Sequence, residues 1–164
     1  MPALETQGER RGPPPLKPFG LVLHHDGRWT HEGIPLKNRK LRAAFDRSVR
    51  YLPDEGKYVV QLAHFRGEIE LEEAGFFVRD FDGRRGEIAL SDRSREPLEV
   101  ASLCLSPIDA ALLCVVKRDL HPQGLLARFY HAPQAELLHA VEDGPDGPAL
   151  RVRGELQTLP DLEG

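Results

Sequence analysis

The sequence has little that would place it in a secreted or membrane-bound class. Its 164 residues include two cysteines, Cys104 and Cys114, too few for the disulfide framework of a small secreted domain. No apolar signal segment follows Met1, and no apolar run is long enough to span a bilayer. We therefore expect a cytoplasmic protein without a membrane partner.

The sequence also lacks the short motifs by which many enzymes are identified. It has no P-loop, no zinc knuckle and no nucleophile elbow, so that no nucleophile, base and orienting residue can be grouped. Positive charge is not in excess, since 22 lysines and arginines stand against 26 acidic residues, for a net charge of -4. Nucleic-acid-binding proteins normally carry a clustered positive excess. We therefore expect a non-enzymatic role, no cofactor, and no nucleic acid as the main partner.

What remains is enough chain for one folded unit preceded by a tail. With 40% hydrophobic residues, a chain of this length buries roughly 70% of its unfolded surface and needs no metal or disulfide. Residues 1–18 are polar, rich in proline and glycine and without an apolar period, which predicts a disordered tail. We expect a first α+β repeat over 19–90 and a second over 97–159, separated by the polar stretch 91–96 and sharing one compact unit.

The stretch HHDGRWTHEG contains the clearest turn signal in the chain. A two-residue Asp-Gly loop predicts a β-hairpin, because both central positions need a positive φ. Pairing across that loop sets His24 opposite Trp29 and places His31 on the same face, diagonal to His24. Zinc normally has three or four protein ligands, and no third ligand follows at a local spacing. We therefore interpret these histidines as packed beside the Trp29 ring.

An amphipathic helix is expected after this hairpin, with Asn38 as its N-cap and Pro53 as its end. The apolar stripe consists of Leu41, Ala44, Phe45, Ser48, Val49 and Leu52. The other side is basic, with Arg39, Lys40, Arg42, Arg47 and Arg50. Such a face can contact phosphates, but the overall negative charge favours a solvated face.

Strands should follow over 57–65, 67–81 and 87–90, where β-branched and aromatic residues gather. The second half repeats the order of the first. It has a hairpin around Ser106-Pro107, a helix over 123–143 that Pro133 should kink or split, and closing strands over 149–159. Symmetric pairing of that hairpin puts its two cysteines on opposite faces, which predicts free thiols. The fold class is therefore α+β, with two similar hairpin-helix-strand repeats forming a largely antiparallel sheet on which helices pack.

The run DGRWTHEGIPLKNRKLRAAF, followed by KYVV and IELEEAGFF, resembles the bacterial family catalogued as domain of unknown function 1285. The family's pattern matches this chain at Asp26, Gly27, Trp29, Gly33, Pro35, Arg39, Leu41, Phe45, Tyr58, Ile69, Glu72 and Phe76. The likeness covers roughly residues 20–158. It implies an α+β fold with two similar repeats and a role in signal transduction, without an assigned activity. The chain departs from the pattern at Leu62, Ala63 and Phe65, where the family carries Thr, Pro and Glu, so that a pocket built from those groups would be altered here.

Three classes of function remain. We favour a small binding or regulatory domain whose partner is a protein or a small molecule, with His24, Trp29, His31 and Arg39 as candidate ligand-binding residues. One alternative is a metal-dependent hydrolase that uses His24 and His31 together with a carboxylate from elsewhere in the chain. The other is a nucleic-acid binder that uses the basic helix face.

Overall fold

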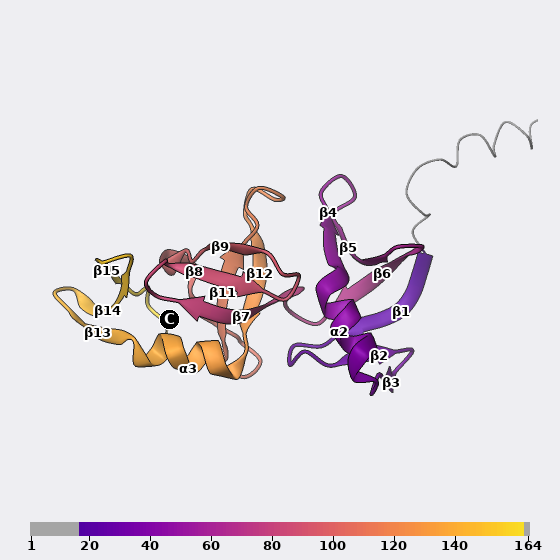
Figure 1. The fold of residues 1–164 in the computed structure, drawn as a ribbon, viewed down its shortest axis with the longest axis horizontal. Helices are drawn as coiled ribbons and strands as arrows, with labels where there is room; N and C mark the ends of the chain where they lie inside the picture. Colours follow the sequence, from indigo (N-terminus) through magenta and orange to yellow (C-terminus); the bar gives the residue numbers. More distant parts are fainter. Residues whose placement is uncertain (1–16, 163–164) are drawn as a thin grey trace, which may run out of the picture.

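The computed structural model describes residues 17–162 (Figure 1). The predicted disordered tail, residues 1–18, lies outside the described residues except for Lys17 and Pro18, which begin the first strand. No helix within the described range is long and apolar enough to cross a membrane.

A six-stranded sheet forms the first half of the fold. Its strands stand in the order β3-β2-β1-β6-β5-β4, antiparallel throughout except for the central pair β1 and β6, which is parallel. Helix α2 joins its two three-stranded meanders and packs against β5. The elements are β1 (Lys17–Leu23), β2 (Trp29–His31), β3 (Ile34–Pro35), α2 (Arg39–Ser48), β4 (Val49–Leu52), β5 (Lys57–Leu62) and β6 (Phe65–Leu71).

A second six-stranded sheet repeats this topology. Its order is β10-β11-β12-β7-β8-β9, again with two antiparallel meanders that meet in a central parallel pair, here β7 and β12. A short 3₁₀ helix stands where the first sheet has α2. The elements are β7 (Phe76–Asp82), β8 (Glu87–Leu90), β9 (Arg95–Pro97), η1 (Val100–Ser102), β10 (Cys104–Leu105), β11 (Leu112–Val116) and β12 (Leu125–Phe129).

The chain ends in a helix and a small antiparallel sheet. These are α3 (His131–His139), which packs against β7 and β12, and the strands β13 (Val141–Gly144), β14 (Gly147–Val152) and β15 (Glu155–Thr158). Figure 1 shows the two large sheets side by side along the long axis, with the small sheet at the far end. The α+β class with two similar repeats is confirmed.

The sheets change between Leu71 and Phe76, earlier than the boundary expected from the sequence. The polar stretch 91–96 lies inside the second sheet, where it forms the turn between β8 and β9 and the start of β9. Each repeating unit is therefore a meander, a helical segment and a second meander. One cluster of buried residues runs through all three sheets and includes Trp29, Phe76 and Leu150.

Two helix predictions need correction. Asn38 does cap α2, because its side chain accepts a hydrogen bond from the Leu41 N–H at 3.1 Å. The helix ends at Ser48, however, and residues 49–52 form β4, since pairing with β5 gives their backbone groups partners. The expected apolar stripe is accordingly narrower, with Phe45 6% exposed and Leu41 40% exposed.

Of the range 123–143 that was expected to be one helix, only the middle part, α3 (His131–His139), is helical. Residues 125–129 are strand β12, whose short apolar run fits a buried strand as well as a helix. Pro133 stands in the first turn of α3, where a missing N–H breaks no helical hydrogen bond. Both cysteines are free thiols, as predicted.

Candidate functional site

The hairpin between β1 and β2 has a different turn from the one predicted. The His24 N–H donates to the Arg28 carbonyl at 2.8 Å, and the Gly27 N–H donates to the His24 carbonyl at 3.0 Å. The loop therefore has three residues, with Gly27 at φ +89 and Asp26 outside the positive-φ region. Three-residue hairpin loops of this type place glycine at their left-handed position. The two-residue Asp-Gly turn was wrong, although the need for glycine was right.

The longer loop shifts the strand register by one residue. Trp29 pairs with Leu23 and His31 with Leu21, so that these side chains share a face. His24 belongs to the other face, where a hydrogen bond of 2.9 Å joins its Nε2 to Oγ1 of Thr30. The predicted His24–His31 pair is therefore wrong. Within residues 17–162, no group of three or more His, Cys, Asp or Glu side chains is placed to hold a metal ion.

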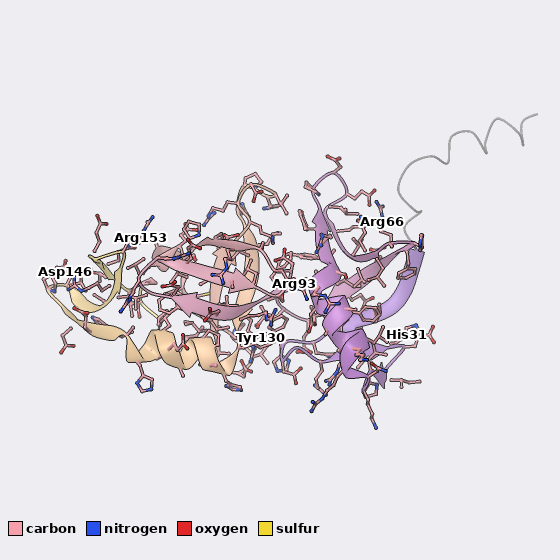
Figure 2. All side chains as sticks on the ribbon, viewed as in Figure 1. His31, Arg66, Arg93, Tyr130, Asp146 and Arg153 are labelled. Atoms are coloured by element: carbon pink, nitrogen blue, oxygen red, sulfur yellow. The ribbon has the colours of Figure 1, made fainter. Side chains whose placement is uncertain are left out.

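The four predicted site residues do not come together. Trp29 is 1% exposed and makes an edge-to-face contact with Phe45 at 5.4 Å between ring centroids. Arg39 is exposed at the first position of α2. Figure 2 shows His31 on the side of the first sheet that faces away from the second sheet. Of the four, Trp29 contacts a residue that lines a charged cavity, because its indole N–H donates to Asp46.

The neighbour of His24 makes a contact that the sequence did not reveal. The His25 N–H donates to Oε1 of Glu72 at 3.2 Å, and the His25 ring contacts the same oxygen. On its other side, Nε2 of His25 lies 3.8 Å from Oδ2 of Asp109, which belongs to the turn after β10. Partial desolvation of Glu72 favours its neutral form, but the hydrogen bonds to His25 and His24 outweigh it and lower the Glu72 pKa. His25 thus links the two large sheets.

Asp109 belongs to a network in which Arg128 forms ion pairs with two carboxylates, those of Asp109 and Glu73. Arg128 donates to Oδ1 of Asp109 at 3.0 Å and to Oε1 of Glu73 at 3.4 Å. Ser106 donates from Oγ to Oε2 of Glu73 at 2.6 Å. The hydrogen bond from Arg128 lowers the Asp109 pKa to about 2. Because each charge in this network has a partner, we interpret it as a structural tie.

A second meeting point of the two sheets has charges without partners. A cavity of about 200 Å³ lies between α2 and the second sheet, and we call it the junction pocket; its lining is Ala43, Asp46, Arg47, Arg79, Ser91, Arg93 and Tyr130. Arg47 comes from α2, Arg79 from β7, and Arg93 from the turn between β8 and β9. Figure 2 shows Arg93 and Tyr130 on the side of the second sheet that faces the first.

The junction pocket is positively charged. Within the described part of the chain, none of its three arginines has a carboxylate within the 4.0 Å that defines an ion pair. Asp46 is the one carboxylate in its lining, and its Oδ1 accepts the Trp29 indole N–H at 2.8 Å. Burial raises the Asp46 pKa more than this hydrogen bond and the nearby arginines lower it. Three cations and one anion leave the pocket with an excess of two positive charges.

The remaining lining residues are held firmly. Tyr130 stacks on Phe77 with ring centroids 5.1 Å apart, and burial together with nearby Asp46 raises the Tyr130 pKa to about 12. Its hydroxyl therefore keeps its proton at neutral pH. Ser91 is 3% exposed, and its Oγ accepts the Phe77 N–H at 3.0 Å. Tyr130 and Ser91 are thus both held in place by contacts with Phe77.

Arg93 has an unusual backbone. Its φ is +72, a left-handed conformation that a bulky non-glycine residue rarely adopts. The Arg93 N–H donates to the Leu90 carbonyl at 2.9 Å, and the Leu90 N–H donates to the Ser94 carbonyl at 2.9 Å, which holds this tight turn. Strained backbone of this kind is found at ligand sites more often than elsewhere. The turn presents Arg93 to a second cavity of about 340 Å³, which shares Arg79 with the junction pocket and adds Arg95.

No local pattern in the sequence pointed directly to this site. Arg79 lies inside the predicted strand 67–81, and Arg93 falls in the stretch that was interpreted as a boundary. The basic face of the helix was noticed, but its partners lie in another sheet. A local pattern cannot reveal that α2 and the β8–β9 turn face one cavity.

Comparison with solved structures agrees with the predicted resemblance. The chain is similar to a DUF1285 family protein from Silicibacter pomeroyi DSS-3, with 17% identity, a TM-score of 0.60, and coverage of 92% of this chain and 89% of that one. This chain has the fold of a DUF1285 family protein. A DUF1285 family protein from Shewanella baltica OS155 is also similar, with 14% identity, a TM-score of 0.49, and coverage of 74% of this chain and 91% of that one. No protein-family model and no curated protein matches. The likeness establishes the fold and carries no activity with it.

Proposed function

We propose that this protein is a binding module for a small anion, which it holds in the junction pocket between the two large sheets. The observation that carries the proposal is the convergence of Arg47, Arg79 and Arg93 from three separate segments onto one cavity. None of the three is neutralised by an ion pair within residues 17–162. A cluster of unpaired guanidinium groups around a cavity is the arrangement that binds phosphate, sulfate or carboxylate groups.

The chemistry of the pocket suits an anion with several oxygens. Each guanidinium group offers N–H donors in a planar fork that fits two oxygens at once. The Tyr130 hydroxyl keeps its proton because its pKa is raised to about 12, and so it adds a neutral donor. Asp46 lowers the positive charge, but its Oδ1 is engaged by the Trp29 indole. An anion with several oxygens, such as a phosphate group, therefore matches these donors.

The position of the pocket supports a regulatory role. Its lining comes from α2 of the first unit and from β7, the β8–β9 turn and Tyr130 of the second. A ligand that contacts both units would stabilise the native packing between them, because it binds the folded arrangement and not the unfolded chain. Such coupling fits a small domain that senses an anion and passes the information to a partner. This extends the signal-transduction role that the sequence resemblance implies.

The experiment is a thermal-shift titration with inorganic phosphate, using Arg93→Asn as the test variant. Asparagine tolerates the left-handed conformation at this position, so the variant removes the charge without adding backbone strain. Arg153→Asn is a matched control, because Arg153 is also exposed, has φ +52, and lies on the small sheet (Figure 2).

We expect phosphate to raise the midpoint of the wild type and of Arg153→Asn to the same extent. Loss of one hydrogen-bonded charge, worth about 1.5–3 kcal/mol, should weaken binding by Arg93→Asn about tenfold or more. The proposal is wrong if phosphate leaves the wild-type midpoint unchanged, or if Arg93→Asn and Arg153→Asn respond alike.

A further inference from the structure

A separate cavity of about 220 Å³ lies within the first unit, beside the β1–β2 hairpin and the start of α2. We call it the hairpin pocket. Three of its lining residues are cationic, Arg28, Lys37 and Arg42, and three others are apolar, Trp29, Pro35 and Leu36. The hairpin pocket shares none of its lining residues with the junction pocket.

The hairpin pocket has no carboxylate in its lining. Arg28 is partly compensated, because its Nε donates to Oδ2 of Asp26 at 2.7 Å. Lys37 and Arg42 have no ion-pair partner within 4.0 Å among the residues that the structure describes. With the charge of Arg28 shared with Asp26, the hairpin pocket keeps an excess of two positive charges over its seven lining residues, equal to that of the junction pocket.

Arg42 provides an independent observation. Its Nε is buried, and no hydrogen-bond acceptor for it lies within the described part of the chain. Buried donors in folded proteins nearly always have an acceptor, and an exception calls for an explanation such as a missing ion. The guanidinium group of Arg42 is therefore desolvated along one edge without compensation. The Nε of Arg66, which does not line this pocket, is buried without an acceptor as well, so the orphaned edge alone does not identify a site. What an anion in the adjoining cavity would supply is a counter-charge for the Arg42 guanidinium group, which lines it.

We propose that the hairpin pocket is a second anion site, which takes a phosphate monoester. Lys37 and Arg42 bind the phosphate oxygens, with a smaller contribution from Arg28, whose charge is shared with Asp26. The organic group of the ester lies against Pro35 and Leu36, which supply the apolar contact that binding pockets commonly offer beside a few polar groups. This site stands apart from the proposed function, because neither its lining nor its unpaired cations belong to the junction.

The chain offers a local probe of the hairpin pocket. Trp29 is the one tryptophan in the sequence, and it lines this pocket. Its indole N–H also donates to Asp46 in the junction pocket, so a ligand at the junction can change its emission as well. The Arg93→Asn variant, which weakens the junction site, separates the two effects.

The test is a titration of Arg93→Asn with glycerol 3-phosphate, followed by Trp29 fluorescence. We expect a saturable change, and adding Lys37→Gln should weaken the apparent affinity about tenfold, as expected for the loss of one charged hydrogen-bonding group. Lys37 is exposed and outside the helix, so this substitution should leave the fold intact. Adding Arg42→Gln should have a similar effect, while Lys57→Gln, far along the chain on β5, serves as a control that leaves affinity unchanged.

The same fluorescence signal distinguishes the sources of the phosphate group. A response to glycerol 3-phosphate that Lys37→Gln weakens indicates a soluble ester, and a response only to vesicles containing phosphatidic acid, again weakened by Lys37→Gln, indicates a lipid headgroup. No response to either ligand overturns the proposal. So does a response that Lys37→Gln and Arg42→Gln leave unchanged. The proposed function is tested by the thermal shift of Arg93→Asn and can fail or stand independently of this result.

Discussion

The Trp29 indole donates a hydrogen bond of 2.8 Å to Asp46, and this bond joins a buried residue of the β1–β2 hairpin to the lining of the junction pocket. Trp29 is 1% exposed, whereas Asp46 is only partly buried. A core residue thus fixes the position of a charged group in the candidate site. Stability and ligand binding should therefore respond together when this pair is changed.

Trp29→Ala should destabilise the protein by about 3–5 kcal/mol, because it removes a fully buried aromatic ring and leaves a cavity. The double variant His24→Ala/His31→Ala should lose no more than about 2 kcal/mol, the value of about two hydrogen bonds, and should fold without added metal. Urea unfolding of both proteins measures the difference. Equal losses, or a double variant that folds only with zinc, would contradict the placement of these residues.

Gly27→Val should also destabilise the fold, since Gly27 has φ +89 and a β-branched residue cannot adopt that conformation without strain. Gly27→Asn is the matched control, because asparagine tolerates the left-handed region. An added Cβ would stand 3.7 Å from the Tyr130 ring, an ordinary contact, so that strain and not collision should dominate. The thermal midpoint should be highest for the wild type, lower for Gly27→Asn and lowest for Gly27→Val. Equal midpoints for the two variants would argue against backbone strain.

Asp46 should make the protein less stable as the pH rises. Its pKa is raised in the folded state from 3.8, so the folded protein holds this proton more tightly than the unfolded chain does. Stability from this group is therefore complete below pH 3.8 and is lost as the pH rises through the folded pKa. Asp46→Asn keeps an acceptor for the Trp29 indole and should remove this dependence. Urea unfolding at several pH values tests it, and an unchanged pH profile in the variant would contradict the burial of Asp46.

The same substitution should strengthen binding at the junction. Asp46→Asn removes the one carboxylate from the lining, so the excess positive charge around the bound anion rises. A phosphate titration of Asp46→Asn should give a several-fold higher affinity than the wild type, with the largest gain at low salt. A lower affinity would mean that Asp46 helps to bind the ligand.

Asp109, unlike Asp46, should make the protein less stable as the pH falls. Its folded pKa is lowered from 3.8 to about 2 by the hydrogen bond from Arg128. The stability that it contributes is therefore present above pH 3.8 and is lost as the pH falls toward about 2. Asp109→Asn should flatten the pH dependence of unfolding in that range. Identical acid unfolding curves would show that the Arg128 contact does not persist in solution.

Local signals in the sequence account for much of the fold. Asn38 could be recognised as a cap because the donor that it satisfies, the Leu41 N–H, lies three residues along the chain. Glycine at position 27 could likewise be explained by turn chemistry. The length of that turn could not be predicted, since two- and three-residue loops both place an Asp-Gly pair at the tip. One residue of difference was enough to move His24 to the other face.

The remaining errors have tertiary causes. Residues 49–52 continue a helical apolar pattern, yet pairing with β5 makes them a strand. Residues 125–129 are a strand because they lie between β11 and β7. The junction pocket depends on the same kind of long-range arrangement, because Arg47 and Arg93 meet only when α2 faces the β8–β9 turn. No periodicity or spacing in the sequence encodes that approach.

The most direct test of the junction site is an NMR titration that follows the arginine Nε–H signals as inorganic phosphate is added. We predict that the signals of Arg47, Arg79 and Arg93 shift together with one apparent affinity, and that the signal of Arg153, in the turn between β14 and β15 of the small sheet, stays in place. Shifts of equal size at Arg153 and at the three junction arginines, or no shift at the three, would contradict an anion site between the two sheets.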